Sequence, residues 1–147
     1  MKTNVEVKSI SRQEALNSSQ RITFENEFIK GSISLNGGLI DDLELKTYNK
    51  ILDSKNKIQL LNPASTNEGY TFNTGWATKS DVRTPNSDTE WKVDGSKTLT
   101  PNNPVKLFYV NDKNIRFERE ITIDSKYLFS VKQTVINQSD ISFKLYP

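Results

Sequence analysis

The 147-residue chain contains no cysteine and no histidine. These absences exclude a disulfide framework, thiolate zinc ligands, a thiol nucleophile, the Ser-His-Asp triad and imidazole acid–base chemistry. The 20 basic and 18 acidic side chains leave a net charge of only +2, and the basic residues are scattered among acidic ones. We therefore expect no nucleic-acid partner. The longest apolar run, 107–110, has four residues, whereas a transmembrane helix needs roughly 20. We also expect no metal and no cofactor.

Residues that favour turns and strands dominate what is present. Asn, Ser and Thr account for 43 positions, and from Arg21 onward apolar residues alternate with polar ones. Ile29, Ile33 and their same-parity neighbours are expected on the buried face of a strand. Gly37 and Gly38 follow, and glycines tolerate the positive φ angles of a tight hairpin, so residues 39–45 should return as the partner strand.

The second half repeats this pattern at intervals of about ten residues. Strands are predicted at 105–110, 115–123, 127–136 and 141–146, separated by clusters rich in Asn, Asp and Ser. Between the halves, shorter apolar pieces interrupt long polar stretches, and Asp94-Gly95 is a candidate for another hairpin turn. Together these features predict an all-β chain, an antiparallel sandwich or barrel rather than βαβ units.

The first 20 residues have few apolar positions and no sustained period. We expect residues 1–20 to form a linker that leads into a domain spanning 21–147. One local exception is predicted, because Ser11 and Glu14 have capping-box spacing and favour a short helix through Ala15 and Leu16.

Arg119 has the parity of the apolar residues Phe117 and Ile121, so its side chain should point toward the core. An unpaired buried charge is costly, so Arg119 must find a structural partner, extend to a rim, or face a ligand; the structural role is the stronger interpretation. Glu118 and Glu120 share the opposite face and resemble a glycosidase pair, but amphipathic alternation places two acids there anyway.

Two further groups have both functional and structural interpretations. Trp76 and Trp91 could stack on a sugar or an extended peptide, although such residues more often fill a core. Asp41 and Asp42 could be drawn as metal ligands, but neighbours on a regular strand face opposite sides and no third ligand is suitably spaced, so a capped turn is favoured.

Five sequence blocks stand out along the chain: SRQEAL at 11–16, KGSISLNGGLIDDLEL at 30–45, IQLLNPAST at 58–66, LTPNNPV at 99–105 and FEREITIDSKYLFSV at 117–131. In this order they resemble the large periplasmic domain of the YidC family of bacterial membrane protein insertases. The resemblance extends from about residue 9 to the C-terminus. Blocks in the expected order over one chain are far more specific than any single motif.

This resemblance implies a β-supersandwich similar to galactose mutarotases, on the periplasmic side of the inner membrane. It also implies that residues 1–20 follow a membrane helix absent from this chain, and that the sandwich in 21–147 is C-terminally incomplete. The parent protein would be membrane-embedded and the present chain its soluble part. The implied role is auxiliary, through contacts with Sec translocon subunits or nascent membrane proteins. No residue inherits a catalytic role, and Gly37 and Gly38 carry over only as hairpin residues.

If the sandwich is incomplete, residues 141–146 form an uncovered edge, and we expect strand-mediated dimers. The alternative functions on the same fold are a carbohydrate-binding module and a mutarotase-like sugar enzyme. The absence of histidine counts against the enzyme, whereas stacking and hydrogen bonds would suffice for a binding module.

Overall fold

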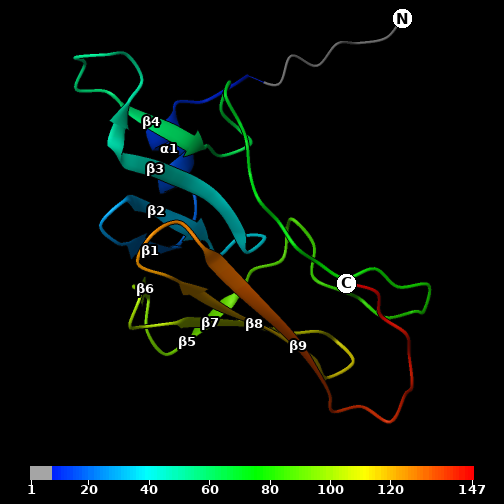
Figure 1. Cartoon of the computed structure of the whole chain (residues 1–147). Coiled ribbons are helices and arrows are strands. Elements are labelled where there is room, and N and C mark those ends of the chain that lie inside the picture. The colour runs from blue at the N-terminus through cyan, green and yellow to red at the C-terminus, as the bar shows by residue number, and fades with distance from the viewer. Residues whose placement is uncertain (1–7) are drawn as a thin grey trace, which may run out of the picture.

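The computed structural model describes residues 8–147 (Figure 1). It contains one short helix and nine strands in two sheets. In chain order these are α1 (Arg12–Asn17), β1 (Arg21–Glu25), β2 (Ile29–Ser34), β3 (Leu39–Asn49), β4 (Lys57–Leu61), β5 (Lys92–Asp94), β6 (Thr98–Leu99), β7 (Val105–Val110), β8 (Ile115–Ile123) and β9 (Phe129–Asn137). The all-β sandwich predicted from the sequence is confirmed.

The first sheet has the order β4-β3-β2-β1-β6. Its neighbours are antiparallel except for β1 and β6, which pair in parallel over two residues. The alternation in β1 buries Ile22 and Phe24 against the core, and Ile29 and Ile33 of β2 do the same. Period-two patterning therefore predicts the buried face of this sheet correctly.

The glycine hairpin joins β2 to β3 as predicted. Gly37 and Gly38 have φ angles of 78° and 63°, the left-handed region that glycine occupies without steric cost. Next to the hairpin, the register of the β2–β3 pairing shifts by one residue. Ser32 pairs with Asp42, whereas the next residue, Ile33, pairs with Ile40. This β-bulge inserts Asp41 as an extra residue in β3 and changes which way the following side chains point.

The second sheet has the order β5-β7-β8-β9 and is fully antiparallel. Strands β7 and β8 occupy the predicted ranges, and β9 lies within two residues of its prediction. Residues in β8 alternate strictly between buried and more exposed positions, so Ile115, Phe117 and Ile121 face the first sheet.

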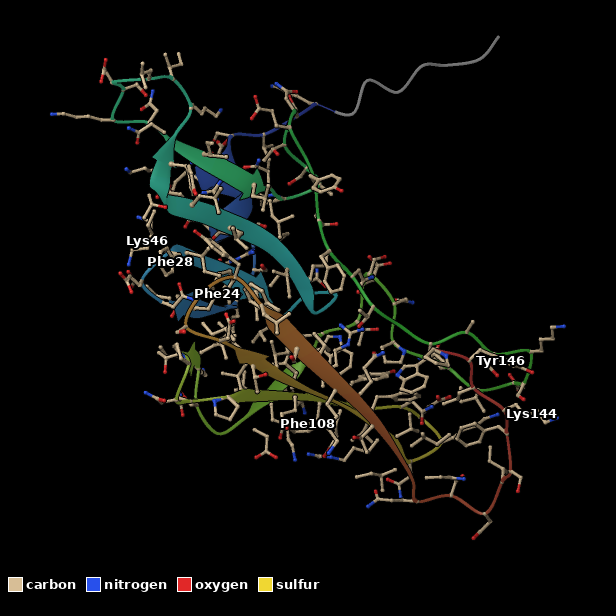
Figure 2. All side chains as sticks on the ribbon, viewed as in Figure 1. Phe24, Phe28, Lys46, Phe108, Lys144 and Tyr146 are labelled. Atoms are coloured by element: carbon tan, nitrogen blue, oxygen red, sulfur yellow. The ribbon has the colours of Figure 1, made fainter. Side chains whose placement is uncertain are left out.

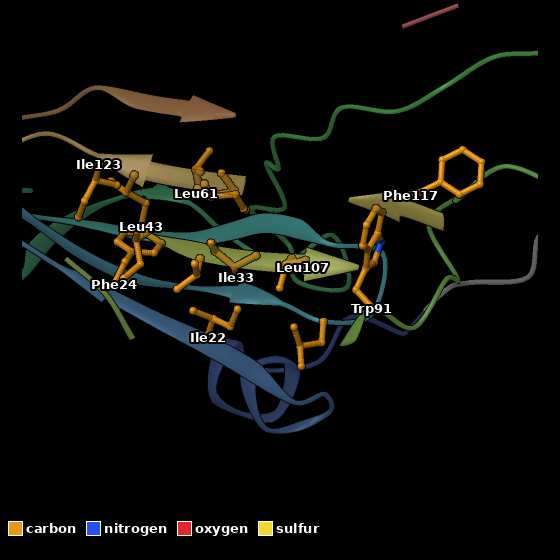
Figure 3. Close-up of a cluster of buried hydrophobic side chains, with 14 of the residues drawn as sticks. Ile22, Phe24, Ile33, Leu43, Leu61, Trp91, Leu107, Phe117 and Ile123 are labelled. Carbon is orange, nitrogen blue, oxygen red and sulfur yellow. The ribbon is translucent and has the colours of Figure 1, made fainter. Parts of the chain in front are cut away.

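The core lies between the two sheets (Figure 3). Phe24 of β1 and Phe129 of β9 meet across it edge to face, with ring centroids 5.1 Å apart. In the part of the chain that the structure describes, eleven large side chains are almost fully buried, including Trp91 and Phe117. Each such side chain contributes about 1.5–3 kcal/mol through removal from water, so this layer stabilises the chain without cysteine.

The predicted capping box is present at α1. The hydroxyl of Ser11 accepts a hydrogen bond from the backbone N–H of Glu14, and the Glu14 carboxylate accepts one from the Ser11 backbone N–H. Ala15 is buried, and the Leu35 backbone N–H donates to the carbonyl of Gln20. Residues 8–20 therefore lie against the first sheet rather than extending away from it. Residues 1–7 of the expected linker lie outside the described residues.

Two local predictions were wrong. Residues 141–146 form no strand; within residues 8–147 their one backbone bridge joins Tyr146 to Ala77, through hydrogen bonds of 2.7 and 2.8 Å. Asp94-Gly95 does not turn a hairpin either, since β5 and β6 belong to different sheets and the segment crosses between them.

The structure of residues 8–147 contains no helix with the length and apolar character of a membrane span.

Candidate functional site

An apolar groove of about 520 Å³ opens where the first sheet and the second sheet meet at their edges. Strands β3 and β4 provide one wall, and β9 provides the other. The lining residues are Ile40, Leu43, Leu60, Leu61, Phe72, Thr74, Tyr127, Phe129 and Val131. Because β4 and β9 are each the outermost strand of their sheet within residues 8–147, the groove lies beside two sheet edges.

Backbone pairing holds one side of this groove in place. Phe72 exchanges two hydrogen bonds with Ile40 of β3, with N···O distances of 2.9 and 3.1 Å, and Tyr70 forms a similar bridge to Asn62. The side chains of Leu60 and Phe72 are nevertheless 52% and 48% exposed. Large apolar side chains thus line a hollow that nothing in the described chain fills.

Arg119 is buried as its parity predicts, with 3% of its surface exposed. Its guanidinium donates to the carbonyl of Gly38 at 3.1 Å and to the carbonyl of Thr74. It therefore ties the hairpin and the 74–77 segment to β8. Burial lowers the pKa of Arg119 to about 10. Among residues 8–147, no carboxylate pairs with it, so two carbonyl dipoles and an aromatic ring stabilise the charge.

Trp91, a candidate for sugar stacking, is 1% exposed and packs in the core beside Arg119 and Tyr109. Trp76 is half-buried and also packs against the core. The indole N–H groups of both residues and the Nε of Arg119 are buried without a hydrogen-bond acceptor in the described chain. Trp91 therefore has no exposed face on which a sugar could stack, which removes one of the two aromatic residues of the carbohydrate-binding alternative.

Asp41 and Asp42 belong to a charged network rather than to a metal site. The bulge turns both carboxylates to the face covered by α1, where Asp41 pairs with Arg21 and Asp42 pairs with Arg12. Ser32 links the two pairs, since its hydroxyl donates to Asp42 at 2.6 Å and accepts from Arg21 at 2.7 Å. Within the part of the chain that is described, no three acidic side chains gather as metal ligands.

Burial and charge act in opposite directions on Asp41. Burial raises the pKa of Asp41, while the guanidinium of Arg21 lowers it, and burial has the larger effect. The network attaches α1 to the sheet: Arg12 lies on the helix, and its Nε also donates to the side chain of Asn62 at 2.9 Å. Its role is structural.

Sequence reasoning missed the groove. Its members come from four separate segments, and the backbone pairing of Phe72 with Ile40 and of Tyr70 with Asn62 has no local sequence signal. The only hint was an aromatic pair at Tyr70 and Phe72 within a long polar stretch. The predicted candidates Trp76, Trp91 and Arg119 do not line it, whereas Thr74, whose carbonyl accepts from Arg119, does.

Comparison with known proteins gives a consistent result. The family model for the YidC periplasmic domain matches residues 21–147. The membrane protein insertase YidC of Pelagibacter ubique is 43% identical over 144 residues, which is 97% of this chain and 26% of that protein. The YidC proteins of Rickettsia canadensis and Mesorhizobium japonicum are 47% and 37% identical, over 87% and 92% of this chain and 23% of each relative. The chain thus spans about a quarter of the length of these relatives.

Proposed function

Because the chain belongs to the family of YidC periplasmic domains, we propose that it assists the insertion and folding of inner-membrane proteins without catalysing a reaction. Its relatives are named membrane protein insertases, and the domain lies on the periplasmic side of the inner membrane. The proposed contribution is contact with emerging chains or with subunits of the Sec machinery.

The apolar groove between β4 and β9 carries this proposal. A chain that emerges before it has folded exposes apolar side chains and unpaired backbone groups. The groove offers a partner for each of these features. Leu60 and Phe72 present apolar surface, and the adjacent strands β4 and β9 are sheet edges. An extended apolar segment would gain burial and backbone hydrogen bonds at one location.

The test is site-specific photocross-linking in the full-length protein within membranes. A benzophenone amino acid replaces Phe72 in the groove, and the matched control replaces Tyr146, an exposed aromatic residue away from it. We expect adducts with chains undergoing insertion, or with Sec subunits, from position 72 and not from position 146. The absence of both kinds of adduct at position 72, or equal yields at the two positions, would contradict the proposal.

A further inference from the structure

The loop between β3 and β4 presents two large aliphatic side chains at its apex. Ile51 and Leu52 are 71% and 89% exposed, the highest values among the large hydrophobic residues of the described range 8–147. Figure 2 shows the side chains of this loop projecting away from both sheets, on the side of the molecule opposite Lys144 and Tyr146. Isolated exposed leucines are common on protein surfaces, but an adjacent pair at the apex of a projecting hairpin is not explained by packing.

Hydrogen bonds give this loop a defined shape. The backbone N–H of Lys50 donates to the carbonyl of Asn56 at 2.8 Å, and the N–H of Ser54 donates to the carbonyl of Ile51 at 3.1 Å. Asp53 adopts a φ of 62°, which completes the turn. The apolar pair is therefore held at the apex by the backbone.

Lysines surround the apex. The segment 46–57 contains four lysines and a single acidic residue, Asp53. Beside it lies a hollow of about 530 Å³ lined by Lys30, Glu44, Lys50, Lys55, Asn56, Lys57 and Gln59. Its one carboxylate, on Glu44, is paired with Lys30 at 3.2 Å. Lys50 lies 3.7 Å from the carboxylate of Glu68, and within residues 8–147 Lys55 and Lys57 form no ion pair, so the hollow carries a net positive charge.

We propose that the β3–β4 loop is a membrane-docking tip, in which Ile51 and Leu52 enter the headgroup boundary of the bilayer while Lys50, Lys55 and Lys57 bind anionic phospholipid headgroups. Apolar side chains flanked by lysines are the combination that holds amphipathic surfaces at a lipid interface. The proposal rests on the periplasmic location of the domain at the inner membrane and not on client contacts.

The tip lies at one end of the fold. In Figure 1 the loop stands at the same end of the molecule as the first described residues. Contacts link the two, because Lys50 lies 3.7 Å from Glu68 and the backbone N–H of Ile10 donates to the carbonyl of Ser65 in the same 62–70 segment. Docking at this end would leave the apolar groove between β4 and β9 open to other molecules.

The test uses the 147-residue chain and vesicles of phosphatidylcholine alone or mixed with phosphatidylglycerol. We expect co-sedimentation with the mixed vesicles, weakened by high salt. The double variant Lys50→Gln/Lys55→Gln should bind about 25-fold more weakly, at about fivefold for each lysine. Leu52→Ser should reduce binding about tenfold. The controls Lys79→Gln/Lys144→Gln and Ile141→Ser change exposed residues outside the tip and should bind like the wild type.

A second measurement tests whether the tip itself enters the bilayer, and it does not depend on the affinity for vesicles. After subtraction of the wild-type spectrum, the tryptophan emission of Leu52→Trp should shift to shorter wavelength when phosphatidylglycerol vesicles are added. The emission of Ile141→Trp should not shift. The proposal is wrong if the wild type ignores anionic vesicles at low salt, or if the control and tip variants lose binding equally. It is also wrong if the tip variants alter only self-association in lipid-free sedimentation, which would make the tip an interface between copies.

Discussion

The guanidinium of Arg119 lies over the indole of Trp91, with its Cζ atom 4.5 Å from the ring centroid. The same guanidinium donates to the carbonyls of Gly38 and Thr74. One buried charge thereby joins β8 to the glycine hairpin and to the segment beside the apolar groove. A planar fork with several donors is suited to this bridging, and a lysine ammonium is not.

We expect Arg119→Lys to lower the free energy of unfolding by about 1–3 kcal/mol, because at least one buried carbonyl loses its donor. Urea unfolding monitored by tryptophan fluorescence measures this directly. The exposed Arg83 provides the control, and Arg83→Lys should change stability by less than about 0.5 kcal/mol. Equal stabilities for wild type and Arg119→Lys would show that the bridge contributes nothing.

Gly38 is required for the same contact. A Cβ atom at this position would lie 2.7 Å from Nη1 of Arg119 and 2.9 Å from Nε1 of Trp91, at a φ of 63°. We expect Gly38→Ala to destabilise the protein by about 2 kcal/mol or more, since backbone strain and the clash add. Gly75→Ala is the matched control, because no heavy atom lies within 4 Å of its Cβ position. Similar midpoints for both variants in thermal unfolding would refute this explanation.

The sequence predicts features that depend on local periodicity. Alternation located β7 and β8 at their observed bounds and assigned Arg119 to the buried face. Paired glycines located the hairpin. These predictions succeed because burial on one face of a strand leaves a period-two pattern whatever the partner strand is.

Features that depend on residues distant in the chain could not be predicted from the sequence. Asp41 and Asp42 were expected on opposite faces, and the bulge at β2 and β3 places both under α1. Residues 141–146 have strand-like alternation, but within residues 8–147 their one backbone bridge is that between Tyr146 and Ala77. A bulge or an unpaired segment is decided by what packs against it, so local alternation does not reveal it. The strand-mediated dimer stays a prediction. Because residues 141–146 form no strand, they would not supply its edge.

Arg12 determines whether α1 remains docked. It is the helix residue that pairs with Asp42 and contacts Asn62, and a six-residue helix is not stable by itself. We expect Arg12→Ala to lower stability by about 2 kcal/mol and to speed amide hydrogen exchange throughout α1, because Asp42 is left partly buried without its partner.

Gln13→Ala serves as the control for this change. Gln13 is the next residue of the helix and is exposed, and its side-chain amide donates a hydrogen bond to Asn17 of the same helix. Its variant should leave exchange in α1 close to that of the wild type. Unchanged exchange in Arg12→Ala would mean that the buried Ala15, rather than the ion pair, holds the helix.

Glu118 should make stability depend on pH in the acid range. The Nε of Arg116 donates to its carboxylate at 2.7 Å, and this hydrogen bond lowers the pKa of Glu118 below the ordinary value of 4.5. Because the folded state binds the proton less readily than the unfolded state, the Glu118 contribution is present above pH 4.5 and is lost as the pH falls through the lowered pKa.

Glu118→Gln removes this dependence. We expect the variant to be less stable than the wild type by about 0.5–1 kcal/mol at neutral pH, the size of a surface ion pair, and the difference to vanish near pH 3. Urea unfolding at the two pH values measures it, and the exposed Glu120→Gln on the same strand is the control. A stability difference that persists at pH 3 would mean that the substituted amide side chain packs poorly and that the charge on Glu118 is not the cause.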